Sequence, residues 1–229
     1  MDPIFLLHGA LGEADQFDKL APLLAPHFQV HRFDLEGHGR RPLGEDQFST
    51  AGFCNNLAAA LDEVGVEQAN LFGYSMGGYV ASAFAHAQPQ RVRRIFTLAT
   101  KFVWSPQIAD KETRMLNADT IEAKLPRFAE ALATRHTALG MRQILAKTAD
   151  YLRTLGNEGG LREKMPDLQL PFRVGIGDRD TMVGAEEARD IFKILPHGQL
   201  QVFPGTPHPF EKVDPSILAA AVIQFFQAP

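Results

Sequence analysis

The sequence predicts an α/β fold, a three-layer α/β/α sandwich in which helices cover both faces of a six-stranded, mostly parallel sheet. Six short runs with strand character alternate along the chain with segments in which apolar residues recur at helical spacing. Residues 3–7 and 172–177 have the apolar texture that is typical of strands buried on both faces. Several runs end in a turn that carries a reactive side chain, and ligands of such folds bind at the carboxyl ends of the strands.

The predicted elements follow one another in a regular order. The strands cover residues 3–7, 29–34, 70–74, 94–99, 172–177 and 199–203, and the main helices cover residues 16–24, 50–64, 79–87, 186–195 and 215–226. Terminal residues support these bounds, because Asp15 and Asp214 are placed to cap helices, whereas Gly65 and Pro89 end them. Parallel strands joined in this way need crossover connections, which are right-handed.

A long segment between the fourth and fifth strands interrupts this order. Residues 101–168 have helical character throughout, with capping-box spacing from Asp119 to Glu122 and with Pro126 at a helix start. Glycines within residues 156–160 end the segment. We therefore expect a single domain over residues 1–229, with residues 101–168 inserted into it as a helical cap.

Composition restricts the classes of function. The 229 residues are 45% hydrophobic, which suffices for one large core, and the single cysteine, Cys54, excludes an internal disulfide. The formal net charge of -4 and the dispersed Lys and Arg residues provide no basic surface for nucleic acid. No apolar run approaches membrane-spanning length, and the first residues lack the features of a signal peptide. We expect a cytoplasmic protein that acts on a small molecule, without nucleic-acid or membrane partners.

The third strand leads into the sequence Gly73-Tyr74-Ser75-Met76-Gly77, and a helix follows it. In a Gly-x-Ser-x-Gly turn between a strand and a helix, the serine has strained backbone angles, and side chains at the two glycine positions would collide with neighbouring elements. The turn raises the Ser75 hydroxyl above the sheet. The Met76 N–H then lies at a helix start, where an oxyanion is favoured. The pattern indicates a nucleophile.

Other reactive side chains also follow predicted strands. His8 comes after the first strand, Asp178 and Asp180 after the fifth, and His208 after the sixth. Because the carboxyl ends of parallel strands share one edge of the sheet, we expect these side chains to converge on Ser75. Either aspartate could instead close a turn, but the spacing Gly-x-x-Asp favours Asp180 as the acid.

Five motifs in order resemble the α/β-hydrolase superfamily, in its single-domain branch with a short helical cap. The motifs are His8-Gly9, Asp34 to Gly39, Gly73 to Gly77, Gly177 to Asp180 and Gly205 to His208. The resemblance covers nearly the whole chain. The family often has two strands before the His-Gly loop, and this chain starts with the strand that leads into it. We therefore expect six strands in the spatial order 2-1-3-4-5-6.

The resemblance implies roles for several residues. Ser75 would be the nucleophile, His208 the general base and then acid, and Asp180 the group that holds the histidine in its useful tautomer. The N–H groups of Met76 and Ala10 would form the oxyanion hole. The strand order follows from this requirement, because the first and third strands must be adjacent for both N–H groups to reach one oxygen.

The substrate pocket is less well defined by the sequence. Apolar residues that flank the expected site are Phe102, Trp104, Met182, Val183 and Phe210, and packing in the core or cap explains them equally well. His8 and His38 stand where family members commonly have structural histidines, Asp34 fits a loop organiser, and Arg40 and Arg41 fit solvated loop positions better than contacts to a substrate carboxylate. The histidines have no metal-ligand spacing, so we expect no metal or cofactor.

The leading functional hypothesis is a serine hydrolase, a carboxylesterase-like enzyme that cleaves a small ester or related acyl bond through an acyl-enzyme. One alternative keeps the fold and triad for a lyase or carbon-carbon bond hydrolase reaction. Another is a small-molecule-binding protein without catalysis, whose usual sign, a missing triad residue, is not present. The sequence identifies neither the acyl and leaving groups nor the oligomeric state.

Overall fold

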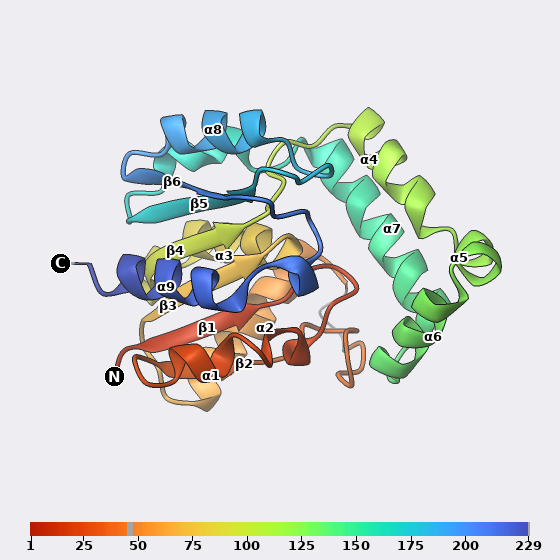
Figure 1. Ribbon diagram of the computed structural model, residues 1–229, viewed down its shortest axis with the longest axis horizontal. Coiled ribbons are helices and arrows are strands. Elements are labelled where there is room, and N and C mark those ends of the chain that lie inside the picture. Colours follow the sequence, from red (N-terminus) through yellow and green to blue (C-terminus); the bar gives the residue numbers. More distant parts are fainter. Residues whose placement is uncertain (45–47, 229) are drawn as a thin grey trace.

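The computed structural model describes residues 1–44 and 48–228. Its centre is a six-stranded sheet in the order β2-β1-β3-β4-β5-β6, in which every neighbouring pair is parallel. Helices lie on both sides of this sheet (Figure 1). The predicted fold class and strand order are therefore confirmed.

The strands lie close to their predicted positions. They are β1 (Pro3–Leu7), β2 (Gln29–Arg32), β3 (Ala69–Tyr74), β4 (Val92–Leu98), β5 (Phe172–Gly177) and β6 (Gly198–Phe203). Every residue of β3 and β5 is buried, including the polar residues Asn70 and Arg173. The edge strands β2 and β6 are more exposed.

The helices of the two outer layers pack in separate apolar clusters. These helices are α1 (Ala21–Leu24), α2 (Thr50–Glu63), α3 (Met76–Ala87), α8 (Ala185–Ile194) and α9 (Pro215–Phe226). Helices α2, α3 and α8 contribute to the larger cluster, whereas α1 and α9 contribute to a second cluster built around Phe17, Phe72 and Phe96. In the described part of the chain, none of the helices has both the length and the apolar character needed to cross a bilayer.

Two helix starts differ from the predictions. The expected helix over residues 16–24 is divided into a 3₁₀ turn, η1 (Ala14–Phe17), and the short α1, because Pro22 lacks the N–H that a continuous helix would use. Asp15 lies inside η1 and does not cap it. In the inserted segment, Asn117 rather than Asp119 caps the helix, since its Oδ1 accepts the Thr120 N–H at 2.8 Å.

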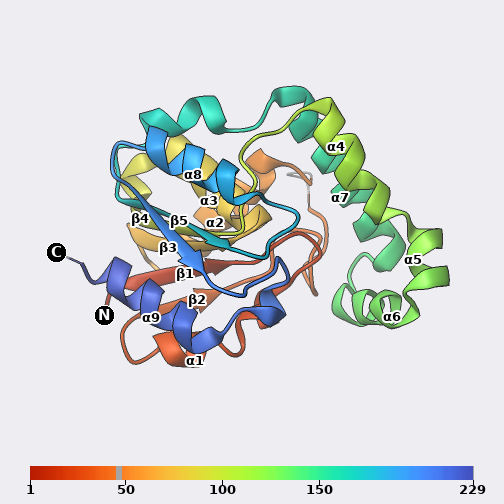
Figure 2. The same cartoon turned by 45° about the horizontal axis from the view of Figure 1, so that its top comes forward.

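The segment between β4 and β5 is helical, as the sequence predicts. It contains α4 (Pro106–Thr113), η3 (Arg114–Leu116), α5 (Ala118–Lys124), α6 (Pro126–Arg135), α7 (Met141–Glu158) and η4 (Arg162–Asp167). Figures 1 and 2 show α4 to α7 beyond the carboxyl ends of the strands, away from the two termini. Residues of α4 and α7, including Ala109, Ile144 and Tyr151, join the larger apolar cluster. This burial fixes the segment against the sheet domain.

A close approach between α4 and α7 depends on Gly156. A Cβ at this position would lie 2.6 Å from the Ala109 Cβ and 2.9 Å from the Ser105 carbonyl oxygen. Real Cβ atoms do not tolerate such distances, so a side chain at this position would force α4 away from α7.

Two buried histidines link the loops after β1 and β2: His8 connects the loops to each other, and His136 connects them to the inserted segment. The Leu35 N–H donates to His8 Nε2 at 3.0 Å, and the Gly39 N–H donates to His136 Nδ1 at 2.9 Å. The other ring nitrogens donate to the carbonyl oxygens of Gly9 (2.8 Å) and Leu11 (3.0 Å). Each ring is thus held as a neutral tautomer. Burial lowers the pKa of both His8 and His136 to about 4.

The close packing of α4 on α7 predicts the effect of Gly156→Ala. Alanine improves helix propensity by about 1 kcal/mol, but overpacking costs about 1 to 3 kcal/mol, so we expect a net loss of stability of about 1 kcal/mol in urea unfolding. Gly184→Ala is the control, because a Cβ there meets nothing within 4 Å. A Gly156→Ala protein as stable as the wild type would contradict the proposed contact.

The neutral histidines predict a loss of stability in acid. Since the pKa of His8 and His136 is lower in the folded chain than in the unfolded chain, the unfolded chain binds more protons between about pH 4 and pH 6.5. The free energy of unfolding should therefore fall by roughly 2 kcal/mol per histidine from about pH 7 to about pH 5. In urea titrations, His136→Gln should remove only the share of this pH dependence that comes from His136, because burial also lowers the pKa of His8 and His38. His27→Gln, which alters an exposed residue, should keep the full pH dependence. Stability that is flat over this range would refute the assignment.

Candidate active site

Ser75 lies between the end of β3 and the start of α3 with φ 51° and ψ -117°. This conformation is rare for a residue with a side chain, and the surrounding structure must maintain it. The Ser75 N–H donates to the Leu98 carbonyl oxygen at 2.8 Å, and Thr100 Oγ1 donates to the Ser75 carbonyl oxygen at 3.0 Å. Both backbone groups of Ser75 are therefore held by the end of β4 and the residues after it.

The two glycines of the motif permit this turn. A Cβ on Gly73 would lie 2.5 Å from the carbonyl carbon of Gly77, and a Cβ on Gly77 would lie 2.6 Å from the His8 carbonyl oxygen. No side chain fits at either position. The glycines allow β1, β3 and α3 to meet at the serine, as predicted from the motif.

Three predicted residues form a chain of side-chain contacts. Ser75 Oγ lies 3.4 Å from His208 Nε2, and His208 Nδ1 lies 2.7 Å from Asp180 Oδ2. A serine-to-histidine distance at the long end of hydrogen bonding is common in nucleophile sites without a ligand. Tyr74 supports the histidine loop, because its hydroxyl donates to the His208 carbonyl oxygen at 2.8 Å.

The structure separates the two aspartates that competed for the acid position. Asp180 contacts His208 with one oxygen, and its Oδ1 accepts the N–H groups of Met182 and Val183, both at 2.8 Å. Asp178 instead accepts the Thr206 N–H at 3.3 Å and so closes the loop that precedes His208. The Gly-x-x-Asp spacing selected the residue that touches the histidine.

The environment of Asp180 favours its carboxylate form. Burial raises the pKa of Asp180, but hydrogen bonds from His208, Val183 and Met182 and the charge of the histidine outweigh burial and hold the pKa below its ordinary value. A carboxylate next to Nδ1 keeps the proton on that nitrogen, and Nε2 is then free to accept a proton from a serine.

Ala10 and Met76 lie beside Ser75 in the wall of one cavity. Parallel pairing of Leu7 in β1 with Gly73 in β3 brings the loop after β1 next to the start of α3. Among the described residues, neither the Ala10 N–H nor the Met76 N–H has an acceptor. Two such donors next to a nucleophile are able to bind an oxyanion.

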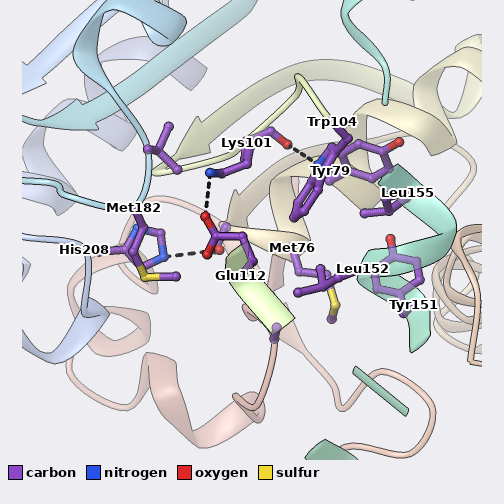
Figure 3. Close-up of a pocket in the computed structure, with 13 residues that line it drawn as sticks. Met76, Tyr79, Lys101, Trp104, Glu112, Tyr151, Leu152, Leu155, Met182 and His208 are labelled. Carbon is purple, nitrogen blue, oxygen red and sulfur yellow. Dashed lines mark hydrogen bonds and ion pairs between the residues drawn. The ribbon is translucent and has the colours of Figure 1, made fainter. Parts of the chain in front are cut away.

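The cavity at Ser75 has a volume of about 90 Å³. Its lining comprises Ala10, Ser75, Met76, Tyr79, Lys101, Trp104, Glu112, Tyr151, Leu152, Leu155, Met182, Val183 and His208. Figure 3 shows Tyr79, Trp104, Tyr151 and Leu155 on one side of Met76, with Lys101, Glu112 and His208 on the other. The cavity is small beside pockets of roughly 300 to 1,000 Å³ for drug-sized ligands.

Three of the five residues proposed for the pocket line it, and two do not. Trp104, Met182 and Val183 are in the wall. Phe102 is fully buried, with its ring packed against Phe172, and Phe210 packs against Phe17 and Tyr74. Phe102 and Phe210 do not line the cavity, because both rings pack in the apolar core.

Sequence reasoning missed most of the wall contributed by the inserted segment. Tyr151, Leu152 and Leu155 come from α7, and the sequence does not indicate that these side chains face the cavity. Lys101 and Glu112 also line the cavity, and their side chains pair at 2.8 Å. A lone lysine and glutamate eleven positions apart carry no recognisable signal in sequence.

The remaining candidate residues have structural contacts. His8 is fully buried. The His38 ring stacks on Phe48, and its Nδ1 lies 3.2 Å from the Glu36 carbonyl oxygen. Asp34 accepts the N–H groups of Ala14 (2.7 Å) and Arg40 (3.2 Å), as expected of a loop organiser. The Arg40 side chain lines a separate surface groove.

Arg41 and Cys54 also lie outside the cavity lining. Arg41 Nη1 donates to the Asp34 carbonyl oxygen at 3.3 Å. Burial raises the pKa of the Cys54 thiol to about 12, as expected of an unreactive cysteine. Within the described ranges, no group of three or more His, Cys, Asp or Glu residues is arranged to hold a metal ion.

Comparison with known proteins identifies relatives over almost the full chain. A pimeloyl-[acyl-carrier protein] methyl ester esterase of Yersinia enterocolitica is 28% identical over 98% of this chain and 93% of its own. A putative 2-succinyl-6-hydroxy-2,4-cyclohexadiene-1-carboxylate synthase of Bacillus subtilis is 23% identical, with coverage of 98% and 90%.

A solved structure has the same fold. The thermophilic esterase from Thermogutta terrifontis, with malate bound, superimposes with a TM-score of 0.81 at 21% identity, covering 99% of this chain and 90% of its own. The family model of the alpha/beta hydrolase fold matches residues 2–165. This match covers both the serine turn and most of the inserted segment. The resemblance inferred from the five motifs is confirmed, and the chain belongs to the α/β-hydrolase fold family.

Proposed function

We propose that the protein is a serine esterase that hydrolyses a small, largely apolar acyl ester through an acyl-enzyme on Ser75. The observation that carries this proposal is the chain of contacts from Ser75 to His208 and Asp180 at the wall of a closed-in cavity. Relatives named as methyl ester esterases support ester hydrolysis as the reaction class.

The contacts suggest a two-step mechanism. His208 Nε2 takes the Ser75 proton as the oxygen attacks the ester carbonyl, and the N–H groups of Ala10 and Met76 stabilise the resulting oxyanion. His208 then gives the proton to the departing alkoxide, so that an alcohol leaves and the acyl group stays on Ser75. Water attacks this acyl-enzyme with His208 again as base, which releases the acid and restores the serine. Asp180 stabilises the imidazolium in both steps.

The inserted segment has the role of a cap in this proposal. Helix α7 contributes Tyr151, Leu152 and Leu155 to the lining of the cavity, and helix α4 contributes Glu112. These side chains restrict water and the length of the acyl group. A cavity of about 90 Å³ favours a short acyl chain over a bulky one.

A lyase or carbon-carbon bond hydrolase reaction is the second candidate. One observation favours it, namely the similarity to the putative synthase of Bacillus subtilis. A lyase of this kind would not accumulate acyl-Ser75. Rapid-quench mass spectrometry with a short ester therefore separates the two reactions, because only the esterase forms a transient adduct with the mass of the acyl group. The same test bears on a non-catalytic binding protein, which would form no adduct.

The proposed roles predict the size of the mutational effects. Ser75→Ala and His208→Ala should each lower kcat for para-nitrophenyl butyrate by roughly 10⁴ to 10⁶-fold, and Asp180→Asn by about 10³ to 10⁴-fold. The double variant Ser75→Ala/His208→Ala should be about as inactive as either single variant, because a histidine without its serine has no proton to remove.

Asp178→Asn is the matched control for the acid. It makes the same chemical change two residues away, at a carboxylate that contacts Thr206 rather than His208. Its loss in kcat should be far smaller than that of Asp180→Asn. A Ser75→Ala enzyme with wild-type activity would refute the nucleophile assignment, and a larger effect at Asp178 would reverse the choice of acid.

A further inference from the structure

An ion pair is built into the wall of the cavity that holds Ser75. Lys101, three residues after the end of β4, directs its Nζ to Glu112 Oε1 of α4 at 2.8 Å. Both side chains line the cavity, and Figure 3 shows them pointing toward each other on the same side of Met76 as His208. The exposed fractions of the two side chains are only 16% and 6%, so water screens this pair poorly.

The two charged groups are held in place from several directions. The Lys101 ammonium lies 5.8 Å from the centre of the Trp104 ring, and the Trp104 Nε1–H donates to the Lys101 carbonyl oxygen at 3.2 Å. Helix α4 is held against α7 by the close approach at Gly156. Glu112 is therefore a fixed partner rather than a mobile surface residue.

Each partner satisfies only part of the hydrogen-bonding capacity of the other. Lys101 has three N–H donors, and in the described part of the chain its ammonium group contacts one acceptor, Glu112 Oε1. Glu112 Oε2 has no hydrogen-bond donor among those residues. The remaining lining is mainly aromatic and aliphatic. A buried ion pair contributes little net stability compared with apolar residues of similar volume, so stability does not explain its presence in this wall.

We propose that the Lys101–Glu112 pair determines the charge specificity of the site, by selecting uncharged acyl esters and excluding esters whose acyl group carries a carboxylate. This inference rests on the proposed esterase function and names its substrate class. Lys101 alone would attract an anionic acyl group, but Glu112 already neutralises it. An entering carboxylate would lie against Glu112 in a poorly hydrated cavity, where like charges repel strongly.

The proposal predicts that removal of the Glu112 charge opens the site to anionic substrates. Glutamine has nearly the same shape as glutamate, and its side-chain oxygen still accepts from Lys101, so Glu112→Gln leaves a cation without a counter-charge. A substrate carboxylate then supplies the missing charge. The test compares methyl pentanoate with monomethyl glutarate, which carries a carboxylate at the far end of a similar chain.

The expected results are ratios of kcat/KM for the anionic ester over the neutral ester, measured by methanol release at about pH 7.5. The wild type should favour methyl pentanoate, and Glu112→Gln should raise the ratio by about 10-fold or more, as expected for one new charge-assisted contact. The double variant Lys101→Met/Glu112→Gln should lose that gain. Glu122→Gln is the matched control, because Glu122 lies on α5, pairs with Arg142 of α7, and is outside the cavity lining.

A binding measurement makes this test independent of turnover. In a Ser75→Ala background, the affinity for glutarate, followed by ligand NMR, should rise with Glu112→Gln and fall back in the double variant. A wild type that prefers monomethyl glutarate, or a Glu112→Gln variant with an unchanged ratio and unchanged glutarate affinity, would overturn the inference. Failure of Ser75-dependent hydrolysis of methyl pentanoate would instead count against the esterase proposal, and the binding result would still decide the role of the pair.

Discussion

The contact between β1, β3 and the start of α3 at Gly73 and Gly77 is the constraint on which the site depends. No Cβ fits at either glycine, since one would collide with the Gly77 carbonyl carbon and the other with the His8 carbonyl oxygen. This closeness holds Ser75 at positive φ and places the start of α3 beside the loop after β1. The geometry costs backbone strain of order 1 to 3 kcal/mol, which the buried strands on either side offset.

The parallel sheet brings the other side chains of the site to the turn that carries Ser75. Strand β5 ends in the turn that carries Asp180, β6 leads to His208, and β4 leads to Thr100, which holds the Ser75 carbonyl oxygen. Each side chain is supplied by a different strand, yet all lie at the carboxyl edge. The inserted helices lie beyond this edge (Figure 1), and the buried contacts of His136 with the loops after β1 and β2 attach them to it.

The parts of this arrangement that were predictable are determined by residues close together in the sequence. The strand texture of residues 3–7 and 172–177 predicted both ends of β1 and of β5. Asp214, which accepts the N–H groups of Ser216 and Ile217, indicated the start of α9. The Gly-x-Ser-x-Gly turn identified Ser75 because its backbone requirement is local. Strand order was also predictable, but only through the requirement that two N–H groups reach one oxygen.

The remaining features depend on packing between distant segments, which sequence spacing does not report. Phe102 and Phe210 were expected in the pocket because they flank it in sequence, but a shift of one or two residues along a loop turns a side chain into the core. Lys101 of the loop after β4 meets Glu112 of α4 although they are eleven positions apart in the sequence. Asn117 is the N-cap residue of α5, because the helix begins at Ala118 and Asp119 already lies inside it.

The central claim is that the strained turn presents Ser75 as a nucleophile activated by His208, and covalent labelling tests it most directly. The protein would be treated with diisopropyl fluorophosphate, in which the attacking serine displaces fluoride, and analysed by intact-mass spectrometry and peptide mapping. The account predicts one adduct per chain, located on Ser75, which forms much more slowly in His208→Ala and is absent in Ser75→Ala. An unlabelled wild type, or an adduct that maps to another residue and persists in Ser75→Ala, would contradict it.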